Sequence, residues 1–274
     1  MEYVSMIISA IVLGIIYVKM IKCDNEPGIT KVQAIIPIVL GIVYVKMIKC
    51  DKEPGISKAQ AIIPIVLGIV ALPLSFVFVI TTAITFMDAG ISGSELPLVA
   101  SSLYSGFFRA GFAEELAKLI MILISLLIFR RRVKNVYEYI LIGAGVGFGF
   151  TIFEEFLYGS EGVIVAVLRL LLITSHMLFG IVMAKHLGLA RYHKVTKQGS
   201  AAMEYIAAIA FPVIIHTLYD ACNGMNKLLD SDDNLIAGIG LIMVIVSFVG
   251  MFIWQVFVLK RIKQDAEKYR AYEV

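Results

Sequence analysis

The sequence predicts an all-α, polytopic transmembrane helical bundle of about eight spans with a cytoplasmic C-terminus. Three observations support this prediction. Of the 274 residues, 59% are apolar and only 16% are charged, whereas soluble chains carry about 25% charged residues. The apolar residues form long runs, and a helix needs about 20 such residues to cross a bilayer. Lysines and arginines gather in alternate connecting segments, as the positive-inside rule requires of a membrane protein.

The apolar runs are interpreted as helices, because only helices and closed barrels satisfy the backbone in lipid. They are too long and too continuously apolar for barrel strands. Pro64 and Pro73 are expected to kink the third run. The candidate spans are residues 3–22, 33–49, 60–87, 106–129, 138–159, 162–184, 201–222 and 235–259.

A tandem repeat occupies the N-terminal region. Residues 11–37 recur at 38–64 with 23 of 27 positions identical, and the repeat then stops abruptly. We therefore divide the chain into a duplicated transmembrane region, 1–70, and a core, 71–274, in which function is expected. Both loops of the duplicated region carry lysines, so the sequence leaves open whether both copies span the membrane.

The distribution of charge orients the spans and excludes other classes of protein. Basic residues are concentrated around 130–134, 185–197 and 260–270, whereas the alternating segments contain Lys227, or Lys227 and Arg109 if the latter is counted. The basic segments, and with them the C-terminus, are therefore expected in the cytoplasm. A net charge of +3 with no basic stripe excludes nucleic-acid binding, and three cysteines exclude a disulfide scaffold.

Among the last five spans, the fourth to the seventh of the chain contain ionisable residues. Such residues are costly in a bilayer and therefore indicate function. With the orientation above, most of them lie in the outer third of the bilayer, and His176 lies nearer the middle. The alternatives are purely structural roles: a Glu115–Lys118 ion pair and a self-contained His216–Asp220 hydrogen bond. The residues concerned are Glu114, Glu115, Lys118, Glu154, Glu155, Arg169, His176, His216 and Asp220.

The shared depth on four helices favours one common site over separate structural pairs. The glycines of GAGVGFG, residues 143–149, form two overlapping G-x-x-x-G pairs, which allow helices to approach closely. We expect this packing to bring Glu154 near its partners. The sequence lacks H-E-x-x-H and a complete intramembrane aspartyl or serine motif, so the site is interpreted as one of carboxylates and histidines.

Four motifs resemble those of the PrsW family of intramembrane proteases, which are distantly related to the CAAX-prenyl endopeptidases. They occur in the family's order over residues 105–225. One departure is Glu155, where the family often has Asn. The motifs are E-E-x-x-K at 114–118, F-x-x-x-E at 150–154, S-H-x-L-F-G at 175–180 and H-x-x-x-D at 216–220.

The resemblance implies hydrolysis of peptide bonds in membrane-anchored proteins, such as an anti-sigma factor, on the outer side of the cell membrane. An ion- or proton-coupled transporter that uses the same buried charges is the main alternative, and a non-catalytic scaffold is another. The predicted catalytic residues are Glu114, Glu115, Glu154, His176, His216 and Asp220, with Lys118 and Arg169 in support.

Two mechanisms are open at this point. In the metal-free one, Glu114 is the general base, assisted by Glu154 or His176. His216, oriented by Asp220, then stabilises the oxyanion. In the metal-dependent one, Glu154, His176 and His216 bind Zn²⁺, and Glu114 is the base.

Overall fold

The computed structural model of the chain describes residues 35–51, 55–88, 96–157, 171–172 and 174–274. Within these ranges the regular structure is helical, apart from one isolated bridge between Asn135 and Glu273. This confirms the all-α prediction. The elements are α2 (Ile36–Cys50), α3 (Ile62–Asp88), α4 (Leu98–Ser105), the π-helix η3 (Gly106–Gly111), α5 (Phe112–Ile128), α6 (Val136–Leu157), α8 (Ser175–Thr196), α9 (Ala201–Gly224), the 3₁₀-helix η4 (Met225–Asp230) and α10 (Asn234–Arg270).

In the described part, α3, α6, α9 and α10 are long and apolar enough to cross a membrane. They coincide with the predicted third, fifth, seventh and eighth spans. The first predicted span, 3–22, lies outside the described residues. The count of eight spans and the cytoplasmic C-terminus therefore stay predictions.

The predicted sixth span, 162–184, differs from the helix at that place. Helix α8 begins at Ser175 and continues to Thr196. Its start coincides with two contacts that the apolar run does not reveal, since the Thr174 backbone N–H donates to Gln255 and the Ser175 hydroxyl donates to the Leu172 carbonyl. His176 therefore lies in the first turn of α8. Residues 162–170 of the predicted span lie outside the described residues, and the predicted depth of His176 near the middle of the bilayer stays a prediction.

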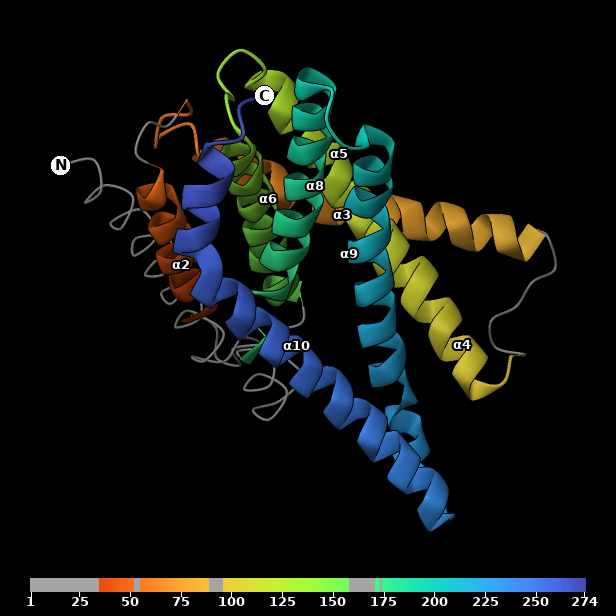
Figure 1. Cartoon of the computed structure of the whole chain (residues 1–274). Helices are drawn as coiled ribbons and strands as arrows, with labels where there is room; N and C mark the ends of the chain where they lie inside the picture. Colours follow the sequence, from red (N-terminus) through yellow and green to blue (C-terminus); the bar gives the residue numbers. More distant parts are fainter. Residues whose placement is uncertain (1–34, 52–54, 89–95, 158–170, 173) are drawn as a thin grey trace, which may run out of the picture.

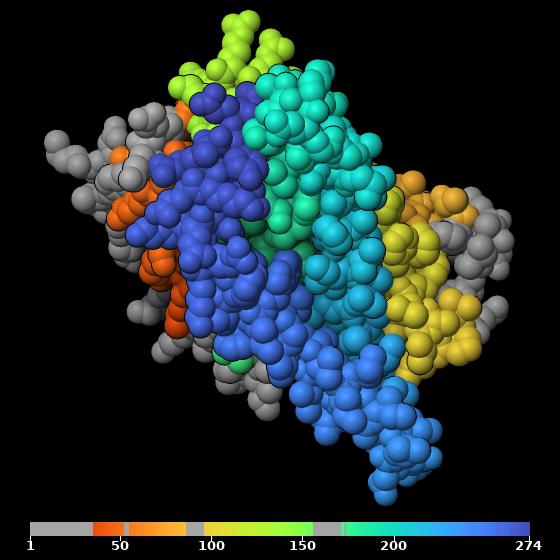
Figure 2. Space-filling view, in the orientation of Figure 1, coloured from red at the N-terminus to blue at the C-terminus, as the bar shows by residue number. Residues whose placement is uncertain are grey.

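Helix α6 forms the centre of the bundle. It is largely buried, whereas α10 is mostly exposed, and it packs against α8, α3, α5 and α2. Figure 1 and Figure 2 show α10 crossing the front of the bundle, with the start of the helix extending beyond the other helices. The exposed part carries large apolar side chains, including Leu235, Ile242 and Ile253, which suits a surface in contact with lipid.

The second repeat copy contributes to this same core. Tyr44 of α2 packs edge-on against Phe148 of α6, and the Tyr137 hydroxyl donates to the Met47 carbonyl. The predicted boundary between residues 70 and 71 falls inside α3. The division into two domains is a prediction that these contacts do not test.

The two G-x-x-x-G pairs of α6 face different neighbours. A Cβ on Gly143 would collide with the Gly180 carbonyl of α8, and a Cβ on Gly149 would collide with the Ile65 carbonyl of α3. The glycines thus allow α6 to approach helices on two sides at backbone distance. This agrees with the predicted packing role and places the C-terminal end of α6, with Glu154, beside the start of α8.

We predict that Gly143→Ala destabilises the protein by about 1–3 kcal/mol, the usual cost of overpacking a tight interface. Gly250→Ala is the matched control, because a Cβ on Gly250 meets nothing within 4 Å and alanine favours the helix. Thermal unfolding in detergent measures both effects. Equal midpoints for the two variants would contradict the packing role of Gly143.

Candidate active site

A cavity of about 970 Å³ opens between α3, α4, α8 and α9. It is large enough for an extended peptide segment, by the usual size of ligand pockets. Its wall combines hydroxyl-bearing side chains with a concentration of ionisable groups. The ionisable residues that line it are Arg109, Glu114, Glu154, Glu155, His176, His216, Asp220 and Lys227.

The glycine-rich π-helix η3 brings α5 against α9. A Cβ on Gly106 would lie 2.7 Å from the Thr217 carbonyl oxygen, and one on Gly111 would lie 2.9 Å from the Val213 carbonyl oxygen. Helix α5 starts directly after this contact, so its first turn, which carries Glu114 and Glu115, faces His216 of α9. π-Helical segments of this kind occur often at functional sites.

Each imidazole of the site has one nitrogen against a carboxylate. His216 Nδ1 lies 2.8 Å from Glu115 Oε1, and His176 Nε2 lies 2.6 Å from Glu154 Oε2. Phe179 stacks on the His216 ring at a centroid distance of 4.9 Å and an interplanar angle of 18°. Hydrogen bonds and stacking therefore fix the orientation of the two rings.

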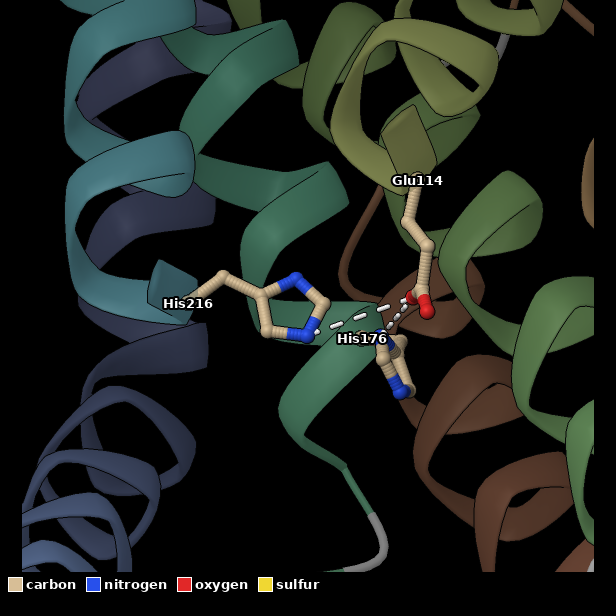
Figure 3. A group of neighbouring side chains, drawn as sticks. All are labelled: Glu114, His176 and His216. Carbon is tan, nitrogen blue, oxygen red and sulfur yellow. Dashed lines mark ion pairs between the residues drawn. The ribbon is translucent and has the colours of Figure 1, made fainter. Parts of the chain in front are cut away.

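Both remaining ring nitrogens lie near Glu114, and each also has a nearer partner: Lys118 Nζ lies 2.9 Å from His176 Nδ1, and Asp220 Oδ2 lies 3.4 Å from His216 Nε2. The Oε2 atom of Glu114 lies 4.0 Å from His176 Nδ1 and 4.0 Å from His216 Nε2, as Figure 3 shows. This oxygen is buried and accepts no hydrogen bond from the described residues. The Lys118 ammonium lies 3.5 Å away and offsets part of its charge, but the hydrogen bond that a buried carboxylate oxygen needs is missing. This oxygen can therefore accept a proton or a cation between the two imidazoles.

Lys118 lies beneath this group and is fully buried. Its ammonium donates to Glu115 Oε1 at 2.8 Å and to His176 Nδ1 at 2.9 Å, and it lies 3.5 Å from Glu114 Oε2. It also lies 3.8 Å above the Phe150 ring. Neither Lys118 nor Glu115 lines the cavity. They lie behind the cavity wall, where they hold Glu114 and the imidazoles in place.

The group of Glu114, His176 and His216 has the donor set of a metal site. One ligand atom from each lies within 4.8 Å of the other two. Ligands about 2.0–2.1 Å from a tetrahedral zinc ion are about 3.4 Å apart, so the three ligand atoms, which lie within 4.8 Å of one another with both Glu114 contacts at 4.0 Å, would have to move closer together around an ion. The Glu154 and Glu115 hydrogen bonds supply the outer carboxylates that usually orient metal-binding histidines.

The structure thus brings together most of the residues that the sequence singled out. Asp220 Oδ2 lies 3.4 Å from His216 Nε2. The predicted ligand set of Glu154, His176 and His216 stays a prediction. The group whose ligand atoms lie within 4.8 Å of one another contains Glu114 instead of Glu154, and Glu154 contacts Nε2 of the His176 ring. Arg169 lies outside the described residues. Sequence reasoning missed Phe179, although its i, i+3 spacing from His176 places it on the same helix face.

Comparisons with known proteins point to one family. A sequence model described as "PrsW family intramembrane metalloprotease" matches residues 59–253, more than half of the chain. Protease PrsW of Halalkalibacterium halodurans is 32% identical over 127 residues, which cover 44% of this chain and 55% of that protein. Protease PrsW of Bacillus subtilis is 31% identical over 122 residues, which cover 43% of this chain and 54% of that protein.

The chain therefore spans about half the length of these two relatives. No solved structure matches it. The matched region includes the four helices that carry the carboxylates and histidines of the cavity. The extent of the family match shows that this chain belongs to the PrsW family of intramembrane metalloproteases.

Proposed function

We propose that the chain is an intramembrane endopeptidase that hydrolyses peptide bonds of membrane-anchored proteins at the Glu114 cavity. The observation that carries this proposal is the position of Glu114 Oε2, which is buried and lies between two imidazoles that other carboxylates orient. The family match favours peptide hydrolysis over the transporter alternative.

We assign Glu114, His176 and His216 as the residues that would hold a divalent ion. The family description includes a metal, and the set of one carboxylate and two imidazoles is typical of catalytic zinc sites. Zn²⁺ in such a site polarises a carbonyl and activates water near neutral pH. Loading requires His176 Nδ1 to give up its contact with Lys118 and His216 Nε2 to give up its contact with Asp220, whereas the ion pair between Lys118 and Glu115 would persist.

The chain's own residues supply the other requirements of hydrolysis. Asp220 is the most exposed carboxylate of the group, at 31% of its side chain, so it is placed to exchange protons between the cavity and His216. Glu154 accepts the hydrogen of His176 Nε2 and thereby leaves Nδ1 with a free electron pair as a ligand. Burial of the site strengthens each of these interactions.

The Lys118–His176 contact supports a metal-free alternative for the same reaction. In this arrangement the ammonium supplies the positive charge of the site, Glu114 accepts the proton of water, and His216 stabilises the oxyanion. Substitution of Glu114 removes activity in both mechanisms, whereas loss of bound metal removes activity in only one of them.

We further propose that the substrate is a single-span protein, such as an anti-sigma factor, cut near the outer face of the cell membrane. The charge bias of the loops supports this orientation. The cavity lies at the end of the bundle that carries η3 and η4, away from the basic segment Arg130–Lys134 that follows α5.

We predict that Glu114→Gln lowers cleavage of a tagged single-span substrate at least about 100-fold, because the variant keeps the side-chain shape but loses the charge. Glu267→Gln is the matched control, since Glu267 is exposed on α10, far along the chain from the cavity. Immunoblots of substrate in cells that express each variant at equal level measure cleavage. Full cleavage of the substrate by the Glu114→Gln variant would contradict the protease proposal.

The outward-facing site generates a topology prediction. In a background with its cysteines replaced by serine, Asp232→Cys near η4 should react with a membrane-impermeant maleimide in intact cells. Arg131→Cys should react only after permeabilisation. Both positions are exposed, so access alone decides the result. The reverse pattern would place the cavity at the cytoplasmic face.

A further inference from the structure

A second cavity, of about 280 Å³, lies between α6, α8 and α10. It shares no lining residue with the catalytic cavity. Helix α10 packs only sparsely against α8, and this loose contact leaves the space open. In Figure 1, α8 and the C-terminal half of α10 lie at the same end of the bundle as the C-terminus.

The wall of the second cavity has an apolar floor and a basic rim. Ile140, Ile181 and Val258 belong to the floor, and Lys185 and Arg261 belong to the rim. Floor and rim together match an amphipathic ligand, because the apolar part requires hydrocarbon and the cations require an anion. Water in this space would leave the apolar floor hydrated, which is unfavourable compared with contact with hydrocarbon.

The rim opens to the surroundings of the protein at Phe257 and Arg261. Phe257 is 53% exposed, and the Arg261 guanidinium stacks on its ring at 5.1 Å. An aromatic ring with a cation at its edge is typical of the level at which lipid headgroups meet hydrocarbon. The cavity is therefore accessible from the lipid phase.

The charges of the rim favour one kind of headgroup. Lys185 interacts electrostatically with the acids Asp265 and Glu204 and with the cations Lys268 and Arg261. Of these four partners, Asp265 and Arg261 line the cavity together with Lys185. Within the described residues, neither Lys185 nor Arg261 forms an ion pair at contact distance. Two cations and one carboxylate leave one net positive charge, which complements a phosphodiester, and Asp265 can accept hydrogen bonds from headgroup hydroxyls.

We propose that this cavity binds an anionic glycerophospholipid, with its phosphate between Lys185 and Arg261 and an acyl chain against the apolar floor. Basic pockets between membrane helices are suited to such headgroups. The free volume fits the headgroup and upper chain, and the rest of the chain can follow the exposed apolar face of α10.

Trp254 connects this site to the catalytic one and reports on it. It lines the second cavity, and its ring lies 5.7 Å from that of Phe179, which stacks on His216. A bound lipid would therefore press on the aromatic support of a catalytic histidine. Trp254 is also the only tryptophan of the sequence, so its fluorescence reads the occupancy of the cavity without added labels.

The test uses the full chain in phosphatidylcholine nanodiscs that contain a small fraction of lipid with brominated acyl chains, which quench tryptophan on contact. We expect brominated phosphatidylglycerol to reach half-maximal quenching at a mole fraction at least about fivefold lower than brominated phosphatidylcholine does. A factor of this size corresponds to the attraction of one interfacial cation for an anionic lipid. Equal quenching by the two lipids in the unmodified protein would overturn the proposal without reference to any variant.

Two double variants with the same change of charge locate the effect. Lys185→Gln with Arg261→Gln should abolish the preference, whereas Lys260→Gln with Lys263→Gln should keep it, because Lys260 and Lys263 are exposed and do not line the cavity. Loss of preference in both variants would show general surface attraction and refute the site. A change of Trp254 fluorescence on addition of inorganic phosphate, without any preference for the anionic lipid, would show that the cavity binds the free anion only, which would also refute a lipid site.

Discussion

The buried contact among Glu115, Lys118 and His216 is the interaction on which the rest of the site depends. Glu115 and Lys118 are both fully buried, and an uncompensated charge at such a place costs about 3–5 kcal/mol. Each group therefore requires the other. Because Glu115 also accepts the Nδ1 hydrogen of His216, this pair fixes the rotation of α5 relative to α9. Glu114, the residue before Glu115 on α5, is then directed toward the cavity.

Close approach of the helix backbones makes this arrangement possible. Gly143 and Gly180 face each other between α6 and α8, and Gly106 and Gly111 bring η3 against α9. Larger side chains at these positions would separate the helices, and hydrogen bonds such as that between His176 and Glu154 tolerate only tenths of an ångström. Small residues set the spacing of the helices, and the buried charges set their rotation.

Much of this could be predicted from the sequence, because apolar runs and ionisable residues within them are strong signals. The helices α3, α6, α9 and α10, the Glu and His cluster and the glycine packing all followed from such patterns. The start of α8 at Ser175 could not be predicted in this way, because the apolar run is continuous there and the Thr174 contact with Gln255 is long-range. The contact between His176 Nε2 and Glu154 could not be predicted from such patterns either, because it depends on the rotation of α6 and α8 about their axes.

The central claim is that Glu114, His176 and His216 converge on one point that can hold an ion. X-ray absorption at the zinc edge of the purified, zinc-titrated protein tests it most directly. The claim predicts one zinc per chain with two imidazole ligands and oxygen donors, and loss of this ion when His176 and His216 are replaced by alanine. Scattering without imidazole, or an unchanged zinc spectrum in the double variant, would contradict it.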